Sequence, residues 1–131
     1  MNNQFEITAI KKDIYLVREP YFSEHANMYV VRGTSFDLLI DCGVGLFDIA
    51  SFLKQKGFNI KLILTHGHFD HAGGIAYFKP EQILVTKQIF ANLKKKETWG
   101  LDFLKTVHFT KEVGFLAKEF CLNFKIIINK K

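Results

Sequence analysis

Short apolar runs alternate with amphipathic segments through most of this chain. Residues 13–17 and 27–32 are rich in β-branched and aromatic side chains, which predicts a strand in each. The apolar run at 38–40 predicts a third strand, which stops before a glycine. Apolar residues then recur at helical spacing over 46–53, and Gly57 is a typical helix stop. The first half of the chain therefore predicts three strands followed by a helix.

The mainly apolar run at 60–65 predicts a strand that is buried on both faces. The elements expected after it are a short helix, a strand and a second helix, over residues 75–79, 82–86 and 87–96. This alternation of strands and helices predicts the α/β class. Residues 99–131 have a mixed periodicity that favours no element. We therefore expect a single domain over residues 1–131, with a tail of undetermined structure from 99 to 131.

The composition narrows the class of protein. A chain of 131 residues has room for one domain with a core, and a hydrophobic content of 48% excludes a disordered chain. The net charge is +5, but the lysines are spread along the chain, which argues against a nucleic-acid partner. We find no signal peptide and no apolar run of about 18 residues, so we expect a cytoplasmic protein without a membrane partner. Cys42 and Cys121 lie far apart, and we expect both to be thiols.

The segment "LTHGHFDHAGG", residues 64–74, concentrates metal-ligating side chains. His66 and His68 are two residues apart at the end of a strand, so their side chains point the same way and offer a pair of ligands to one metal such as zinc. Asp70 and His71 follow where the chain must turn, and their offset suits a second metal. An imidazole with a carboxylate fits Zn, Fe or Mn. We therefore predict one or two zinc ions here, with Fe or Mn as alternatives.

"THGHFDHAGG" resembles the His-x-His-x-Asp-His signature of the metallo-β-lactamase superfamily in its glyoxalase II-like form. The segments "ANMYVVRG" and "LLIDCG" precede the signature in the order found in that family. The resemblance implies an αββα sandwich, of which this chain supplies only the first half. It also implies that His66 and His68 bind the first metal, and that Asp70 and His71 bind the second. Asp70 would also be the catalytic residue that orients the attacking water, and Asp41 a second-sphere residue that holds a ligand histidine.

The resemblance breaks down beyond the signature. The family takes a third histidine, a bridging aspartate and a final histidine from its second half, and two ligands per metal make a weak site. His108 is the one later histidine, and it lacks the family's glycine and proline neighbours. We expect His108 to be a surface or half-buried residue and Asp102 to be solvated. A shortened gene, a complementing second chain and a homodimer are the three explanations, of which the first is favoured.

Three functions are consistent with these features. The leading hypothesis is a metallo-β-lactamase-fold hydrolase, or the N-terminal fragment of one, that uses metal-activated water on a thioester, ester or lactam bond of a small-molecule substrate. The second is a catalytically inactive, truncated remnant that binds metal weakly. The third is a nuclease-branch metallo-hydrolase, which the basic charge permits. The sequence does not specify the substrate.

Overall fold

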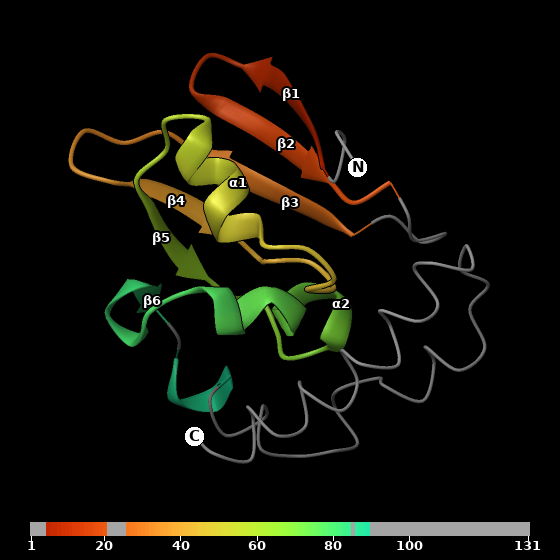
Figure 1. The fold of residues 1–131 in the computed structure, drawn as a ribbon. Coiled ribbons are helices and arrows are strands. Elements are labelled where there is room, and N and C mark those ends of the chain that lie inside the picture. The colour runs from red at the N-terminus through yellow and green to blue at the C-terminus, as the bar shows by residue number, and fades with distance from the viewer. Residues whose placement is uncertain (1–4, 21–25, 85, 90–131) are drawn as a thin grey trace.

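The computed structural model describes residues 5–20, 26–84 and 86–89, which form a six-stranded sheet with helices packed on it (Figure 1). The strands are β1 (Glu6–Lys11), β2 (Ile14–Arg18), β3 (Asn27–Val31), β4 (Asp37–Ile40), β5 (Ile60–Ile63) and β6 (Ile83–Leu84). The α-helices are α1 (Ile49–Gln55) and α2 (Phe69–Ala72), and the 3-10 helices are η1 (Gly73–Tyr77) and η2 (Pro80–Gln82).

The sheet is mixed. Its strands follow one another in chain order; β1 to β4 pair antiparallel, whereas β5 pairs parallel with both β4 and β6. The parallel pair β4–β5 needs a crossover connection, and α1 supplies it. Its register aligns Ile40 with Ile63, so the two strands end side by side. The segments that follow these two strands therefore leave the sheet side by side at the carboxyl ends of the strands. Binding sites of α/β folds lie at this end of the sheet.

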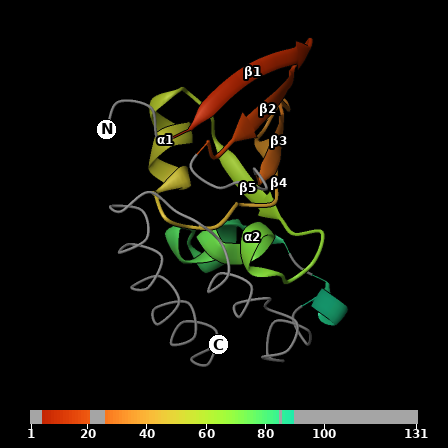
Figure 2. The same cartoon turned by 90° about the vertical axis from the view of Figure 1, so that its right-hand side faces the viewer.

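The core lies between one face of the sheet and α1, which runs along that face in Figure 2. The fully buried side chains include residues of four strands and of the helix: Val17, Met28, Val30, Leu39, Leu62, Ile49 and Leu53. Along β3 the burial alternates, since Met28 and Val30 are buried while Tyr29 and Val31 are 36% and 37% exposed. The second face of the sheet therefore carries partly exposed apolar side chains.

The α/β class is confirmed, and the predicted strands at 13–17, 27–32, 38–40 and 60–65 correspond to β2 to β5. The strand expected at 82–86 is reduced to β6. β1 was not predicted, because its polar-apolar alternation extends only from Glu6 to Ala9 and is interrupted at Ile10. Five of its six residues are exposed. The described part of the chain contains one sheet, so it corresponds to one half of the expected sandwich.

Two helix predictions need correction. The helix expected over 46–53 begins only at Ile49, because Asp48 caps it by accepting a hydrogen bond from the Ser51 amide at 2.9 Å. The helix expected over 75–79 is instead the 3-10 helix Gly73–Tyr77. Its glycines pack against the loop after β4, and this contact fixes where the turn begins.

Several sequence predictions fall outside the described residues. They concern His108, Asp102, Cys121 and the tail at 99–131, and most of the helix expected over 87–96, of which residues 87–89 are helical. Within the described ranges, no helix combines the length and the apolar character needed to cross a bilayer. The cytoplasmic location and the single domain over residues 1–131 stay predictions.

A backbone contact joins the loop after β4 to the start of η1. The Gly73 amide donates to the Gly43 carbonyl oxygen at 2.8 Å. Gly45 has a φ of +85°, and a Cβ atom at this position would overlap the Gly73 carbonyl group. Only glycine combines this backbone conformation with so close an approach. The residues that follow β5 are therefore held directly against the residues that follow β4.

Gly45 and Gly57 form a matched pair for testing this contact. Their φ angles are +85° and +88°, but a Cβ atom at Gly57 would have nothing within 4 Å. We expect Gly57→Ala to lower the free energy of unfolding by about 1–2 kcal/mol through its left-handed backbone alone. Gly45→Ala should lower the free energy of unfolding by more than Gly57→Ala does, because its Cβ atom would also overlap the Gly73 carbonyl group. Urea unfolding of both variants measures the difference, and equal losses would contradict the contact.

Candidate metal site

The four predicted metal ligands follow β5 in the chain, on the segment that leads into α2 and in α2 itself. Figure 1 shows α2 beyond the end of β5. His66 and His68 are on the segment that leaves the strand, and His68 is the N-cap residue of α2. Asp70 and His71 lie within α2, where the sequence predicted only a turn. The amides of His71 and Ala72 both donate to the His68 carbonyl oxygen, at 3.0 and 2.8 Å. The short helix therefore folds Asp70 and His71 back toward His66.

Three of the four side chains form a compact group of donor atoms. His66, Asp70 and His71 each offer one ligand atom, and these atoms all lie within 4.8 Å of one another. His71 Nε2 is 3.6 Å from Asp70 Oδ2. A tetrahedral ion with ligands at about 2.1 Å holds neighbouring donors about 3.4 Å apart, which is close to the distance between His71 Nε2 and Asp70 Oδ2. The three side chains could therefore hold one ion.

His68 lies beside this group. Its ring centroid is 4.7 Å from that of His66, while the centroids of His66 and His71 are 4.1 Å apart. The sequence motif predicts that His66 and His68 bind one metal, and that Asp70 and His71 bind another. In the structure, the compact group contains one residue of the first pair, His66, and both residues of the second pair, because α2 brings Asp70 and His71 to His66. The role of these residues as metal ligands stays a prediction.

Asp41 is buried at the end of β4 and faces His71. Its side chain is 6% exposed, and its Oδ2 atom lies 2.7 Å from His71 Nδ1. The backbone fixes both partners, since the Asp41 amide donates to the Ile63 carbonyl oxygen and the Cys42 amide to that of His71, each at 2.8 Å. An ionised carboxylate can only accept, so Nδ1 carries a proton. In the neutral imidazole the lone pair is therefore on Nε2, which lies 3.6 Å from Asp70 Oδ2. This is the arrangement of a metal-ligating histidine with its second-sphere carboxylate.

Thr65 extends the same network to His66, and the sequence analysis gave it no role. Its amide donates to Asp41 Oδ1 at 2.8 Å, and its hydroxyl lies 2.7 Å from Asp41 Oδ2 and 2.9 Å from His66 Nδ1. Because Asp41 can only accept, the Thr65 hydroxyl donates to it and accepts from His66 Nδ1–H. His66 then also keeps the lone pair on Nε2. The sequence signal was available, since a hydroxyl residue stands between the strand and the first histidine.

The pKa shifts follow from these contacts. Burial alone would raise the pKa of Asp41, but the hydrogen bonds from His71 and Thr65 hold it below its usual value. The same bond to Asp41 raises the pKa of His71, against the effect of burial. Burial and the charges of His71 and His68 lower the pKa of His66. Asp41 is therefore ionised at neutral pH, and His66 loses its proton more readily than His71.

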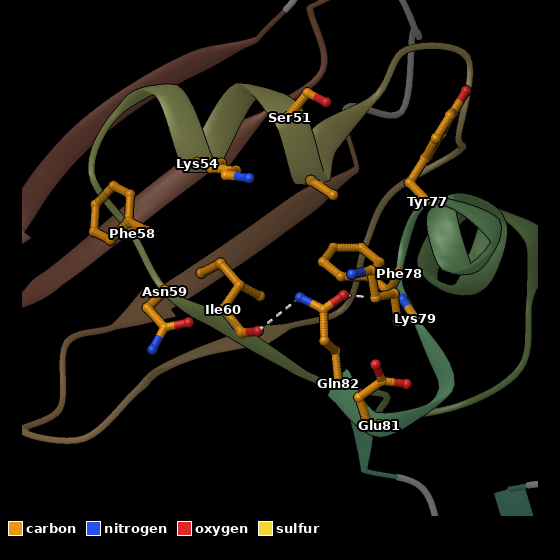
Figure 3. Close-up of a pocket in the computed structure, with 11 residues that line it drawn as sticks. Ser51, Lys54, Phe58, Asn59, Ile60, Tyr77, Phe78, Lys79, Glu81 and Gln82 are labelled. Carbon is orange, nitrogen blue, oxygen red and sulfur yellow. Dashed lines mark hydrogen bonds between the residues drawn. The ribbon is translucent and has the colours of Figure 1, made fainter.

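A separate groove of about 610 Å³ lies between α1, the start of β5 and the two 3-10 helices (Figure 3). Both apolar and polar residues line it, among them Phe58, Ile60, Phe78, Lys54, Asn59 and Gln82. Gln82 Nε2 donates to the Ile60 carbonyl oxygen at 3.3 Å. None of the four predicted ligands lines it, so the groove is distinct from the histidine cluster.

Sequence comparison relates the chain to a known family. The model of the metallo-beta-lactamase superfamily matches residues 23–87, about half of the chain. The acyl-coenzyme A thioesterase MBLAC2 of Gallus gallus is 29% identical over 126 residues, which cover 83% of this chain and 44% of the chicken protein. The chain thus spans less than half of the length of this relative.

Structural comparison gives the same fold. The DIM-1 metallo-beta-lactamase, in a crystal exposed to ceftazidime, superposes with a TM-score of 0.60 at 18% identity, over 72% of this chain and 48% of that one. FIM-1 from Pseudomonas aeruginosa, in its mono-zinc form, gives a TM-score of 0.56 at 17% identity, over 66% and 44% of the two chains. At these identities the likeness shows the fold alone.

Replacing Asp41 tests the contact with His71. We expect Asp41→Asn to lower the pKa of His71, because the neutral amide no longer favours the imidazolium. The pKa is measured by following the His71 ring protons by NMR as the pH is varied in the metal-free protein. Asp13→Asn is the matched control, since Asp13 lies in the turn between β1 and β2 at a φ of 62°, which asparagine tolerates. An unchanged His71 pKa in Asp41→Asn would contradict the hydrogen bond.

The matched segment contains both halves of the site described above. It includes Asp41 at the end of β4 and the whole of the motif from His66 to His71. The fold that carries these residues superposes on that of a solved metallo-beta-lactamase. The chain belongs to the metallo-beta-lactamase superfamily.

Proposed function

We propose that the protein is a metal-dependent hydrolase that cleaves a thioester, with His66, His68, Asp70 and His71 as the metal ligands. The observation that carries the proposal is the convergence of donor atoms beyond β5, where the ligand atoms of three of these residues lie within 4.8 Å of one another. The hydrogen bond from His71 to Asp41 supports it further. A cluster of histidines with no role as ligands has no need of a buried carboxylate that fixes one ring nitrogen.

The donor set fits zinc. Imidazole nitrogens and a carboxylate oxygen are typical ligands of catalytic zinc sites, which combine protein ligands with a position for water. FIM-1, a solved relative, is in a mono-zinc form. Fe and Mn accept the same donors and are the alternatives. We propose zinc because the histidines outnumber the carboxylate at this site.

Each side chain has a separate task in this proposal. A bound zinc ion of this kind supplies a nucleophile near neutral pH by lowering the pKa of water to about 7. Asp41 and Thr65 hold His71 and His66 with Nε2 turned toward the donor group. Asp70 is partly exposed, with 29% of its side chain accessible, and its Oδ2 atom is close to His71 Nε2. Its carboxylate can therefore accept a hydrogen bond from the attacking water and orient it toward the substrate carbonyl.

The thioester is proposed from the sequence relative. The chicken protein is named an acyl-coenzyme A thioesterase, and its similarity extends over 83% of this chain. The two solved beta-lactamases are 17% and 18% identical, so they support the fold but give no reason to prefer a lactam. Because the chain spans 44% of the chicken protein, the activity of that whole protein comes to this chain only as a proposal.

Zinc binding is the first test of the proposal. We expect the purified chain to bind zinc, with the stoichiometry and affinity measured by calorimetry. His66→Ala and His71→Ala should each abolish tight binding, because each removes one of the three converging donors. Circular dichroism of the metal-free variants controls for folding. Less than one tightly bound zinc per chain would favour the alternative of an inactive remnant.

Hydrolysis of an acyl-coenzyme A is the second test, with the released thiol as the readout. We expect turnover by the zinc-loaded protein, and a loss of at least about 10²–10⁴-fold in activity for Asp70→Asn, because the change removes both one of the three converging donors and the carboxylate that would orient the water. Asp13→Asn is the same chemical change in the turn between β1 and β2 and should retain full activity. If the zinc-loaded protein releases no thiol even at high protein concentration, the proposal that it is a thioester hydrolase is contradicted.

A further inference from the structure

Glu19 is a buried carboxyl group that the proposed chemistry does not use. It directly follows β2 and is 2% exposed. A glutamate is almost never fully buried without a partner, because removing its charge from water costs several kcal/mol. The burial raises the pKa of Glu19 to about 8, although the hydrogen bond described below lowers it in part. The group is therefore mainly neutral at pH 7, and its effect on the surroundings is that of a hydrogen-bonding side chain.

The partner of Glu19 is the loop after β4. Its Oε1 atom accepts a hydrogen bond from the Val44 amide at 2.6 Å, and the bond is buried. The neighbouring Gly43 has a φ of +71°, and a Cβ atom there would overlap the carboxyl group of Glu19. The loop therefore has both an amide aimed at the carboxyl group and a glycine that leaves room for it. The amide of Val44 and the space at Gly43 together match a carboxyl group at the position of Glu19.

The same loop holds the backbone of the histidine motif. The Gly43 carbonyl oxygen accepts from the Gly73 amide, and the Cys42 amide donates to the His71 carbonyl oxygen, both at 2.8 Å. Cys42 Sγ lies 3.4 Å from that same oxygen. A continuous chain of contacts thus runs from Glu19 through Val44 and the loop to the residue that carries one of the candidate ligands.

We propose that Glu19 is a positioning residue for the candidate metal site: it fixes the loop at 42–45 through Val44, and the loop fixes the backbone at His71 and Gly73. The part of this inference that concerns metal affinity rests on the proposed function. The part that concerns the backbone does not. The hydrogen bond of Glu19 is to the Val44 amide and not to a proposed ligand, so Glu19 acts through the loop.

Glu19→Leu and Glu19→Gln separate this role from simple core packing. Leucine fills space but accepts no hydrogen bond, whereas the amide oxygen of glutamine can accept from Val44. In metal-free protein we expect Glu19→Leu to speed hydrogen exchange at the Cys42 and Gly73 amides, but not at the amides of the central strands β3 and β4. Zinc affinity should fall by about 10–100-fold, the range for loss of a second-sphere partner, and Glu19→Gln should restore both properties.

Glu19→Asp provides a milder variant in case the leucine does not fold. It withdraws the carboxyl group by one methylene, and the same two amides should exchange faster, to a smaller degree. Exchange that rises equally in β3 and β4 would show a purely structural role and overturn the proposal, as would unchanged exchange at Cys42 and Gly73. A wild-type chain that binds no zinc would defeat the proposed function, while the exchange data would still decide the role of Glu19.

Discussion

The candidate site depends on one buried carboxylate, that of Asp41. Its side chain is 6% exposed, and it accepts hydrogen bonds from the His71 ring and from both the amide and the hydroxyl of Thr65. Burial of a charge is unfavourable unless every lone pair finds a donor, and here the donors outweigh the cost, since the pKa of Asp41 is lowered. The same bonds set the orientation of two histidines. The Asp41 carboxylate, which is fixed by the fold, therefore orients two of the proposed metal ligands, His71 directly and His66 through Thr65.

The position of Asp41 follows from the sheet. β4 and β5 are parallel and in register at their ends, so the residue after β4 meets the segment after β5. If the two strands were antiparallel, their carboxyl ends would lie at opposite ends of the pair and the two segments would not meet. The glycines then let the two segments touch along the backbone, through the contacts of Gly43 and Gly45 with Gly73. The site is consequently built on backbone geometry as well as on side chains.

Much of this could be predicted from the sequence, and the failures have physical causes. The apolar runs of β3 and β5 and the histidine motif are local signals, and the structure shows them at the places expected. β1 was missed by the sequence prediction because an exposed strand pairs through its backbone and needs no regular apolar pattern. Residues 69–72 are helical because of backbone bonds to His68, which no side-chain periodicity over four residues can reveal. The tasks of Thr65 and Glu19 depend on contacts with residues 24 and 25 positions away in sequence.

In the proposed site, Asp41 holds His71 with Nε2 directed at the metal. The most direct measurement is nitrogen NMR of the His71 ring in metal-free and zinc-loaded protein, at a pH above the raised pKa of His71. We expect the Nδ1–H tautomer in the metal-free protein, and we expect zinc to shift the Nε2 resonance and to leave the Nδ1 proton in place. A dominant Nε2–H tautomer, or zinc coordination through Nδ1, would contradict it.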